Sequence, residues 1–135
     1  MVWESEGFEV DAREYPLIRV HFPHTPTEAG YRALFAHYAE LCERGKGIGW
    51  LIDFREFDPV FASPAIRAAA AAVFKQYRGT LLAATRCEGR VASNAVSRGI
   101  LTAFDWLTGP KWECKNFAEL SDAEAWVRSR LQSAH

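Results

Sequence analysis

The chain has 135 residues, of which 49% are hydrophobic and 24% charged, and its formal net charge is −1. This length fits one domain over residues 1–135, and the hydrophobic fraction excludes a disordered chain. No hydrophobic run approaches the roughly 20 residues of a membrane-spanning helix, and the acidic start lacks the features of a secretory signal. Three cysteines without a CxxC motif are typical of reduced thiols. We therefore expect a soluble protein of the cytoplasm.

Charge is distributed unevenly along the chain. Residues 1–60 carry 6 basic and 11 acidic side chains, whereas residues 61–118 carry 8 basic and 3 acidic ones. The favoured interpretation is that the two halves interleave and neutralise each other locally, and the alternative is head-to-tail pairing in a homodimer. A nucleic-acid binder would show a basic excess and a recognition motif, so this class is not expected.

Taken in chain order, the sequence first predicts a hairpin. Hydrophobic and polar residues alternate over residues 8–12 and 18–22, which is typical of strands buried on one face. A helix follows, in which Thr25 is the expected cap, Glu28 closes a capping box and Gly45 supplies the stop. Residues 48–54 are almost continuously hydrophobic, which indicates a central strand covered on both faces.

The second half of the chain continues to alternate helices and strands. Ser63 is the expected cap of a second helix, and residues 80–85 predict a strand. A third helix is expected from Val91 to Gly109, then a strand over residues 112–117 and a last helix with a capping box at Ser121. The order ββαβαβαβα predicts an α/β fold: a mixed, mostly parallel five-stranded sheet with four flanking helices and its first strand at an antiparallel edge.

The residue patterns of common enzymes are missing from the sequence. It contains no Gly-x-Gly-x-x-Gly, P-loop or Gly-x-Ser-x-Gly motif, so we expect neither an enzyme nor a cofactor. His21 and His24 lack a third metal ligand near them. Asp53, Glu56 and Asp58 have the residue types of a Mg²⁺ site, but capping or pairing of Asp53 with an arginine is the favoured interpretation. We therefore expect no metal.

Three features after the central strand remain to be explained. At the start of a helix, a phosphate on Ser63 would be tolerated electrostatically. The segment 57–61 has three large hydrophobic residues in five, which either fold under the molecule or form an exposed patch for a partner. Cys87, beside Arg86, is expected to be an exposed thiol, but no histidine lies near it in sequence to act as a base.

Four segments resemble the SpoIIAA-like family, a branch of the STAS-like domains (sulfate transporter and anti-sigma factor antagonist): 15–18 (YPLI), 51–55 (LIDFR), 101–107 (LTAFDWL) and 117–127 (FAELSDAEAWV). The resemblance implies a mixed five-stranded sheet flanked by four helices, without catalytic machinery. Anti-sigma antagonists carry a phosphorylated serine in an Asp-Ser-Ser-Gly type of turn, and here only Ser63 corresponds, because the glycine is absent and Pro64 follows. The branch is also similar to lipid-carrying SEC14-type domains, which implies a small apolar ligand between helices and sheet.

Two functional hypotheses follow. The first is a non-enzymatic regulatory module that docks a protein partner through the 57–66 loop and the second helix, with contacts from Phe57, Phe61, Ser63 and Arg67. The alternative is a carrier of a small apolar ligand or lipid, with a pocket lined by Trp50, Phe74, Phe104 and Trp106. The same aromatic residues also fit a closely packed core. Homodimerisation through the exposed edge strand is a further expectation.

Overall fold

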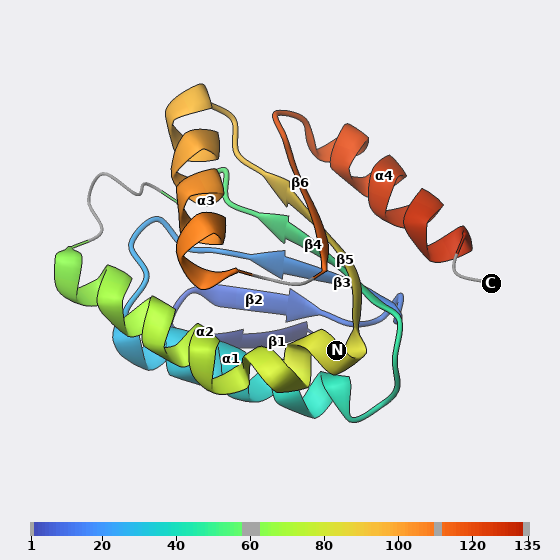
Figure 1. Ribbon diagram of the computed structural model, residues 1–135, viewed down its shortest axis with the longest axis horizontal. Helices are drawn as coiled ribbons and strands as arrows, with labels where there is room; N and C mark the ends of the chain where they lie inside the picture. Colours follow the sequence, from blue (N-terminus) through green and yellow to red (C-terminus); the bar gives the residue numbers. More distant parts are fainter. Residues whose placement is uncertain (1, 58–62, 110–111, 134–135) are drawn as a thin grey trace.

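Six strands form one mixed sheet within residues 2–57, 63–109 and 112–133, which the computed structural model describes (Figure 1). For residues 103, 104 and 106–108 it describes the backbone alone. The strands lie side by side in chain order: β1 (Val2–Ser5), β2 (Phe8–Asp11), β3 (Leu17–His21), β4 (Ile48–Asp53), β5 (Thr85–Val91) and β6 (Glu113–Phe117). The pairs among β1, β2 and β3 are antiparallel, and those among β3, β4, β5 and β6 are parallel. The predicted mixed, mostly parallel α/β class is confirmed.

The described sheet has one strand more than the five predicted, because β1 precedes the expected hairpin. The turn between β1 and β2 uses Glu6 and Gly7, both with positive φ, of 53° and 84°. β1 is only four residues long, and its Val2 is 41% exposed, so its sequence carries little of the alternation that marks a strand. The antiparallel edge of the sheet is therefore β1, and the strand predicted at residues 8–12 lies one place inward.

Four helices follow strands β3 to β6 in the described part of the chain: α1 (Glu28–Cys42), α2 (Pro64–Ala84), α3 (Ala95–Thr108) and α4 (Leu120–Gln132). Two of the predicted caps are wrong. The hydroxyl of Thr27, and not that of Thr25, accepts a hydrogen bond from the N–H of Gly30 at the start of α1. α4 begins at Leu120, before the capping box predicted at Ser121. Ser63 caps α2 as predicted, accepting from the N–H of Ile66 at 3.1 Å.

The border between α2 and β5 lies later in the chain than predicted. α2 continues through residues 80–84, which the sequence analysis assigned to a strand, and β5 extends to Val91, which it assigned to the third helix. Leu81 and Ala84 continue the buried face of α2 at helical spacing, and both residue types favour helices. α3 starts only after Asn94, whose side-chain oxygen accepts from the N–H of Ser97.

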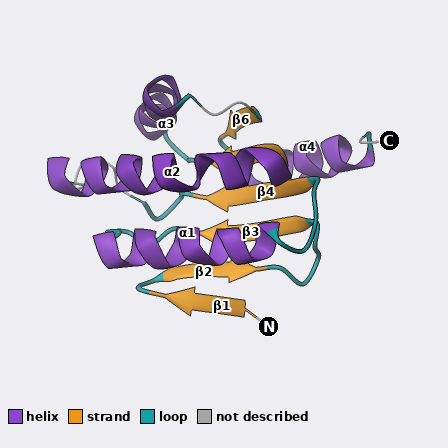
Figure 2. Ribbon diagram, turned by 60° about the horizontal axis from the view of Figure 1, so that its bottom comes forward, coloured by secondary structure: helices purple, strands orange, loops and turns teal. Residues whose placement is uncertain are grey.

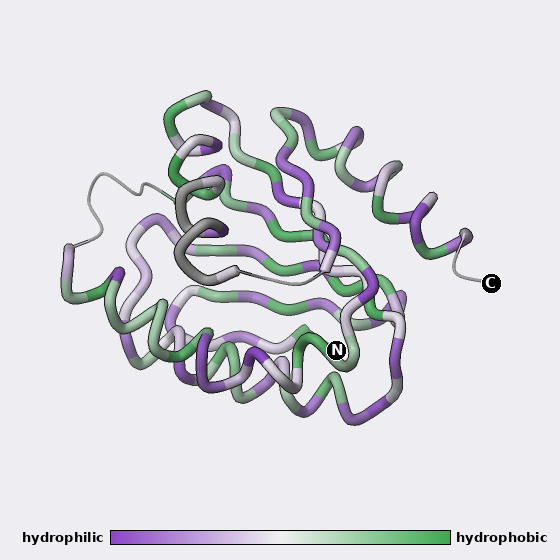
Figure 3. The backbone as a smooth tube through the Cα atoms, viewed as in Figure 1, coloured by the Kyte–Doolittle hydropathy of each residue, from purple (hydrophilic) through white to green (hydrophobic). Residues whose placement is uncertain are grey.

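Helices cover both faces of the sheet, but unevenly (Figures 1 and 2). Hydrophobic and hydrophilic residues alternate along β2, whereas β4 is mostly hydrophobic (Figure 3). Successive side chains of a strand point to opposite faces, so the sheet contributes to a core on each side. On one face, Ile18 and Trp50 belong to a large core with residues of α1, α2 and α3. On the other face, Leu17 and Leu51 belong to a smaller core with Val127 of α4.

The close approach of α4 to the sheet depends on two glycines. A Cβ atom added to Gly49 of β4 or to Gly89 of β5 would lie 2.8 Å from a methyl group of Val127. At both positions a side chain would be directed at α4, so its absence leaves room for the helix. The opposite side chains of β5 are therefore directed at α2 and α3, where the cavity described below lies.

Candidate functional site

A cavity of about 140 Å³ lies between the sheet and helices α1, α2 and α3. Close-packed protein interiors leave few voids larger than a water molecule, so a cavity of this size is a candidate ligand site. Most of its lining is hydrophobic, and includes Phe35 and Tyr38 of α1, Trp50 and Ile52 of β4, Phe74 of α2 and Leu101 of α3. Arg67 and Ile100 also line it and are both exposed, so the cavity opens to solvent between α2 and α3.

Aromatic rings pack around the cavity in a connected series. The ring centroids of Tyr38 and Trp50 are 4.4 Å apart, and those of Phe35 and Tyr38 are 5.0 Å apart. Phe74 contacts Phe35 on one side and Trp112 on the other, with centroids at 6.2 and 5.9 Å. Such tilted and edge-on contacts are the preferred geometry of aromatic pairs, so the walls of the cavity hold each other in place.

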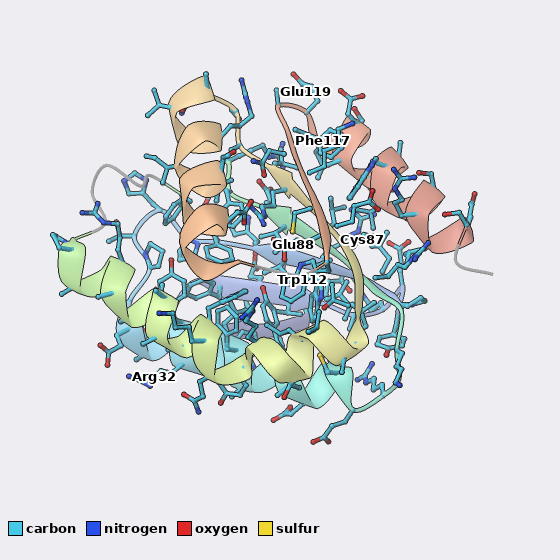
Figure 4. All side chains as sticks on the ribbon, viewed as in Figure 1. Arg32, Cys87, Glu88, Trp112, Phe117 and Glu119 are labelled. Atoms are coloured by element: carbon cyan, nitrogen blue, oxygen red, sulfur yellow. The ribbon has the colours of Figure 1, made fainter. Side chains whose placement is uncertain are left out.

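Three charged side chains form a cluster in the cavity wall. Arg90 of β5, only 5% exposed, donates hydrogen bonds at 2.8 and 2.6 Å to the two carboxylate oxygens of Asp105 in α3. It also donates to Glu88, which accepts from the indole N–H of Trp112 at 3.3 Å (Figure 4). Burial alone would lower the pKa of Arg90, but Glu88 and Asp105 raise it, so the guanidinium stays charged. Two carboxylates thus share one buried cation.

Tyr38 places a polar atom in this hydrophobic surrounding. Its side chain is 5% exposed, and its hydroxyl oxygen has no hydrogen-bond partner among the described residues. Burial raises the pKa of Tyr38 well above its usual value of 10, and the charge of Glu88 raises it further. The hydroxyl is therefore protonated at neutral pH, with its capacity to donate and accept hydrogen bonds unused by the protein around it.

Two of the four residues predicted for a ligand pocket line this cavity. Trp50 and Phe74 both contribute to its wall. The indole N–H of Trp50 is used internally, since it donates to the hydroxyl oxygen of Thr85 at 2.9 Å. The side chains of Phe104 and Trp106 lie outside the described residues, although the backbone at both positions belongs to α3.

The residues predicted for partner docking lie in different environments. Phe57 packs inward, with ring centroids 6.0 Å from Phe22 and 5.7 Å from Phe54, and it lines the cavity. Arg67 lies at the cavity opening, and Ser63 is exposed at the start of α2. Phe61 lies outside the described residues. The structure thus brings Phe57 and Arg67 to one cavity, while docking itself stays a prediction.

The favoured interpretation of Asp53 is confirmed. Its carboxylate accepts from the backbone N–H of Arg55 at 2.9 Å and from the Arg55 guanidinium at 2.8 Å. Burial raises the pKa of Asp53, but these hydrogen bonds outweigh it and the net shift is downward.

His21 and His24 both contact Glu56: Nε2 of His21 lies 3.1 Å from its carboxylate, and Nδ1 of His24 lies 3.0 Å from its carbonyl oxygen. Asp58 lies outside the described residues.

The expectation that Cys87 is exposed is wrong. Its side chain is fully buried against α4, because β5 extends to Val91, whereas the sequence analysis ended this strand at residue 85. Burial raises the pKa of the Cys87 thiol to about 11. All three cysteines are free, with Cys42 and Cys114 partly buried. None of them has the low pKa and accessibility of a reactive thiol.

Sequence reasoning did not assign five polar residues that line the cavity to a ligand pocket: Tyr38, Glu88, Arg90, Asp105 and Trp112. A signal for two of them was present, because residues 87–91 alternate hydrophobic or small residues with Glu88 and Arg90 as a half-buried strand does. Tyr38 occupies the buried face of α1, where a tyrosine is normally read as part of the core. Only the tertiary structure brings Asp105 of α3 to Arg90.

Comparison with known proteins gives one match. The model of a protein family described as SpoIIAA-like matches residues 17–128. No curated protein and no solved structure matches the chain. Within the described residues, none of the helices combines the length and the hydrophobicity that crossing a bilayer requires. The matched segment contains every described residue of the cavity lining, from Phe22 to Trp112.

Proposed function

Because the chain belongs to the SpoIIAA-like family of STAS-type domains, we propose a non-enzymatic regulatory role in the cytoplasm that depends on binding a small apolar ligand. The observation that carries this proposal is the cavity of about 140 Å³ between the sheet and three helices. Its aromatic walls offer a ligand extensive hydrophobic contact, and its opening between Arg67 and Ile100 offers a way in. This role combines the regulatory module of the first sequence hypothesis with the small apolar ligand of the alternative.

The cavity volume sets the size of the ligand. A hydrophobic cavity of roughly 150 Å³ in an engineered protein accommodates benzene, whereas pockets for drug-sized molecules occupy about 300 to 1,000 Å³. The volume here is about 140 Å³, which suits a molecule of one ring or a short hydrocarbon chain. A long-chain lipid would need additional space, so a single-ring molecule is the better candidate.

A cavity-filling variant tests this proposal. In Ala70→Leu, the larger side chain enters the cavity from α2, where Ala70 is buried in the lining. Toluene should raise the melting temperature of the wild type, and its effect should be lost in the variant. Ala72→Leu makes the same change at an exposed position of the same helix and should respond to toluene like the wild type. Failure of toluene and other one-ring hydrocarbons to bind the wild type would contradict the proposal.

A second candidate function is supported by exposed hydrophobic residues beside the opening. Val96 of α3 is 64% exposed, and Ile100, one turn later, is 37% exposed and lines the cavity. Exposed hydrophobic patches mark interaction sites, so a protein partner seated here would cover the opening. Of the predicted docking residues, Arg67 lines the same cavity as Ile100. Ligand binding and partner docking would then be coupled at one place.

Substitutions on the two helices test the docking function. A partner co-isolated with the wild type from its own cells should be retained less by Val96→Asp, which places a charge in the patch. Leu82→Asp introduces the same change at an exposed position near the other end of α2, and should retain the partner. Equal retention by both variants would exclude the patch as the docking surface.

A further inference from the structure

We propose that the cavity selects neutral one-ring molecules that carry a hydrogen-bond acceptor, and that the hydroxyl of Tyr38 binds this acceptor. The inference rests on the proposed ligand-binding function and names the class of ligand. Phenol represents the class, because it combines one ring with one neutral polar group.

The ring of Tyr38 is fixed by its neighbours. It packs between Phe35 and Trp50, with centroid distances of 5.0 and 4.4 Å, and all three side chains line the cavity. A tyrosine in this position has only small freedom to move its hydroxyl toward a distant partner. A buried hydroxyl without a hydrogen bond is unfavourable, so a ligand that supplies the missing bond gains affinity.

Three other polar side chains of the lining use their N–H groups within the protein. The indole N–H of Trp50 donates to Thr85, and that of Trp112 donates to Glu88. The guanidinium of Arg90 is shared between Glu88 and Asp105. Among the described lining residues, Tyr38 alone has a buried side-chain oxygen or nitrogen without a hydrogen bond. A polar group on the ligand can therefore supply a missing hydrogen bond to a buried side chain of the described lining at one position, the hydroxyl of Tyr38.

Charge in the cavity wall disfavours an anionic ligand beside Tyr38. The two carboxylates of Glu88 and Asp105 share the guanidinium of Arg90, and the negative charge of Glu88 acts on Tyr38. Arg67, the other cation of the described lining, is exposed at the opening of the cavity. A carboxylate ligand placed at Tyr38 would be repelled by Glu88 and would lose its hydration. The hydroxyl of Tyr38 is protonated, because burial and Glu88 both raise its pKa, so it has a hydrogen that it can donate to the ligand. A neutral acceptor is the group that fits.

Calorimetric titration of phenol and toluene into wild type and Tyr38→Phe tests the inference. The two ligands have nearly the same shape, and the substitution removes only the hydroxyl oxygen. Loss of one hydrogen bond should weaken phenol binding roughly fivefold and leave toluene binding unchanged. Tyr15→Phe is the matched control, because its hydroxyl also lacks a partner among the described residues but lies outside the cavity lining. It should bind both ligands like the wild type.

The possible outcomes separate this inference from the proposed function. Equal phenol affinity in wild type and Tyr38→Phe, with toluene bound by both, would overturn the role of Tyr38 and leave the ligand cavity standing. Tighter binding of benzoate or benzylamine than of phenol would overturn the preference for a neutral ligand. Absence of binding by every compound to the wild type would overturn the proposed function and the inference with it. Retained toluene binding also shows that Tyr38→Phe is folded.

Discussion

Arg90 of β5 and Asp105 of α3 form a two-bond ion pair that joins the sheet to the helix, with N–O distances of 2.8 and 2.6 Å. The pair lies in the wall of the cavity, together with Glu88. Arg98 adds a second tie near the start of α3, because its guanidinium donates to the carbonyl oxygen of Ala92 at 2.8 Å. The position of α3, and with it the shape of the cavity, depends on these polar contacts.

Removing the charge of Asp105 should destabilise the protein. In Asp105→Asn, the buried guanidinium of Arg90 keeps only Glu88 as an anionic partner. We expect the free energy of unfolding to fall by about 2 kcal/mol, because a buried charge that loses a partner is costly. The pair is 5% and 26% exposed, so solvent screens it little. Urea unfolding followed by circular dichroism gives the value.

An exposed ion pair provides the control for this prediction. Glu28 and Arg32 of α1 are separated by 3.3 Å, and both side chains are more than half exposed. Glu28→Gln should change the free energy of unfolding by about 0.5 kcal/mol or less, because exposed pairs contribute little. If the two substitutions had equal effects, the buried pair would have no special structural role.

Adding a methyl group beneath α4 should also destabilise the protein. In Gly89→Ala, the new Cβ atom would lie 2.8 Å from Val127, so the helix must shift or the side chain must change its rotamer. Overpacking of this kind costs about 1 to 3 kcal/mol. Gly79→Ala is the matched control, because its new Cβ would meet nothing within 4 Å and alanine favours a helix by about 0.5 to 1 kcal/mol. In thermal denaturation, the melting temperature should therefore fall for Gly89→Ala and rise for Gly79→Ala.

The thiol of Cys87 should react only when the protein unfolds. Its side chain is fully buried and burial holds its pKa at about 11, so the reactive thiolate is scarce at neutral pH. A variant with serine at Cys42 and Cys114 leaves Cys87 as the single thiol. Iodoacetamide at pH 8 should label this variant rapidly in urea and very slowly in buffer, as measured by mass spectrometry. Rapid labelling in buffer would show that β5 opens from α4 in the folded protein.

Stability should decline in acid, partly through Asp11. Hydrogen bonds from Arg13 lower the pKa of Asp11 to about 2, from 3.8 in the unfolded chain. A carboxyl group whose pKa is lowered by folding stabilises the protein above its unfolded pKa, and the contribution is lost as the pH falls through the folded value. The stabilising contribution of Asp11 is therefore lost as the pH decreases from about 4 to about 2.

Comparison of two variants isolates this contribution. Asp11→Asn should show a smaller loss of unfolding free energy over this range than the wild type, measured in urea at each pH. Some loss should remain, because Arg19 and Arg128 also lower the pKa of Glu124 through hydrogen bonds. Glu43→Gln, at the exposed C-terminal cap of α1, should keep the wild-type dependence. Identical curves for all three proteins would exclude Asp11 as a contributor.

Local sequence patterns were enough to predict most of the fold. α1 was predicted from apolar residues at helical spacing, and Tyr31, Leu34, Tyr38 and Leu41 are all buried as that spacing requires. β1 was missed because it is short and half exposed, so its pairing with β2 depends on the adjoining hairpin. Residues 80–84 were assigned wrongly because leucine and alanine in the last turn of a helix resemble a short buried strand.

The candidate site was predicted less completely than the fold, and the reason is physical. Trp50 and Phe74 were recognised as pocket residues because large aromatic side chains between sheet and helices either fill a core or line a cavity. The roles of Glu88, Arg90 and Asp105 depend on the register of β5 and on the position of α3 above it. No pattern along the chain records that contact, since it joins residues 15 positions apart in two different elements.

The match to the SpoIIAA-like family begins at residue 17, whereas the hydrophobic core begins earlier. Phe8 and Val10 of β2 are 0% and 1% exposed, and the ring of Phe8 contacts Phe22 and Tyr31, with centroids at 4.8 and 5.4 Å. Both of these partners also line the cavity. The limits of the recognisable family sequence are therefore not the limits of the hydrophobic core, and an expression fragment cut at residue 17 would lose one layer of support behind the cavity.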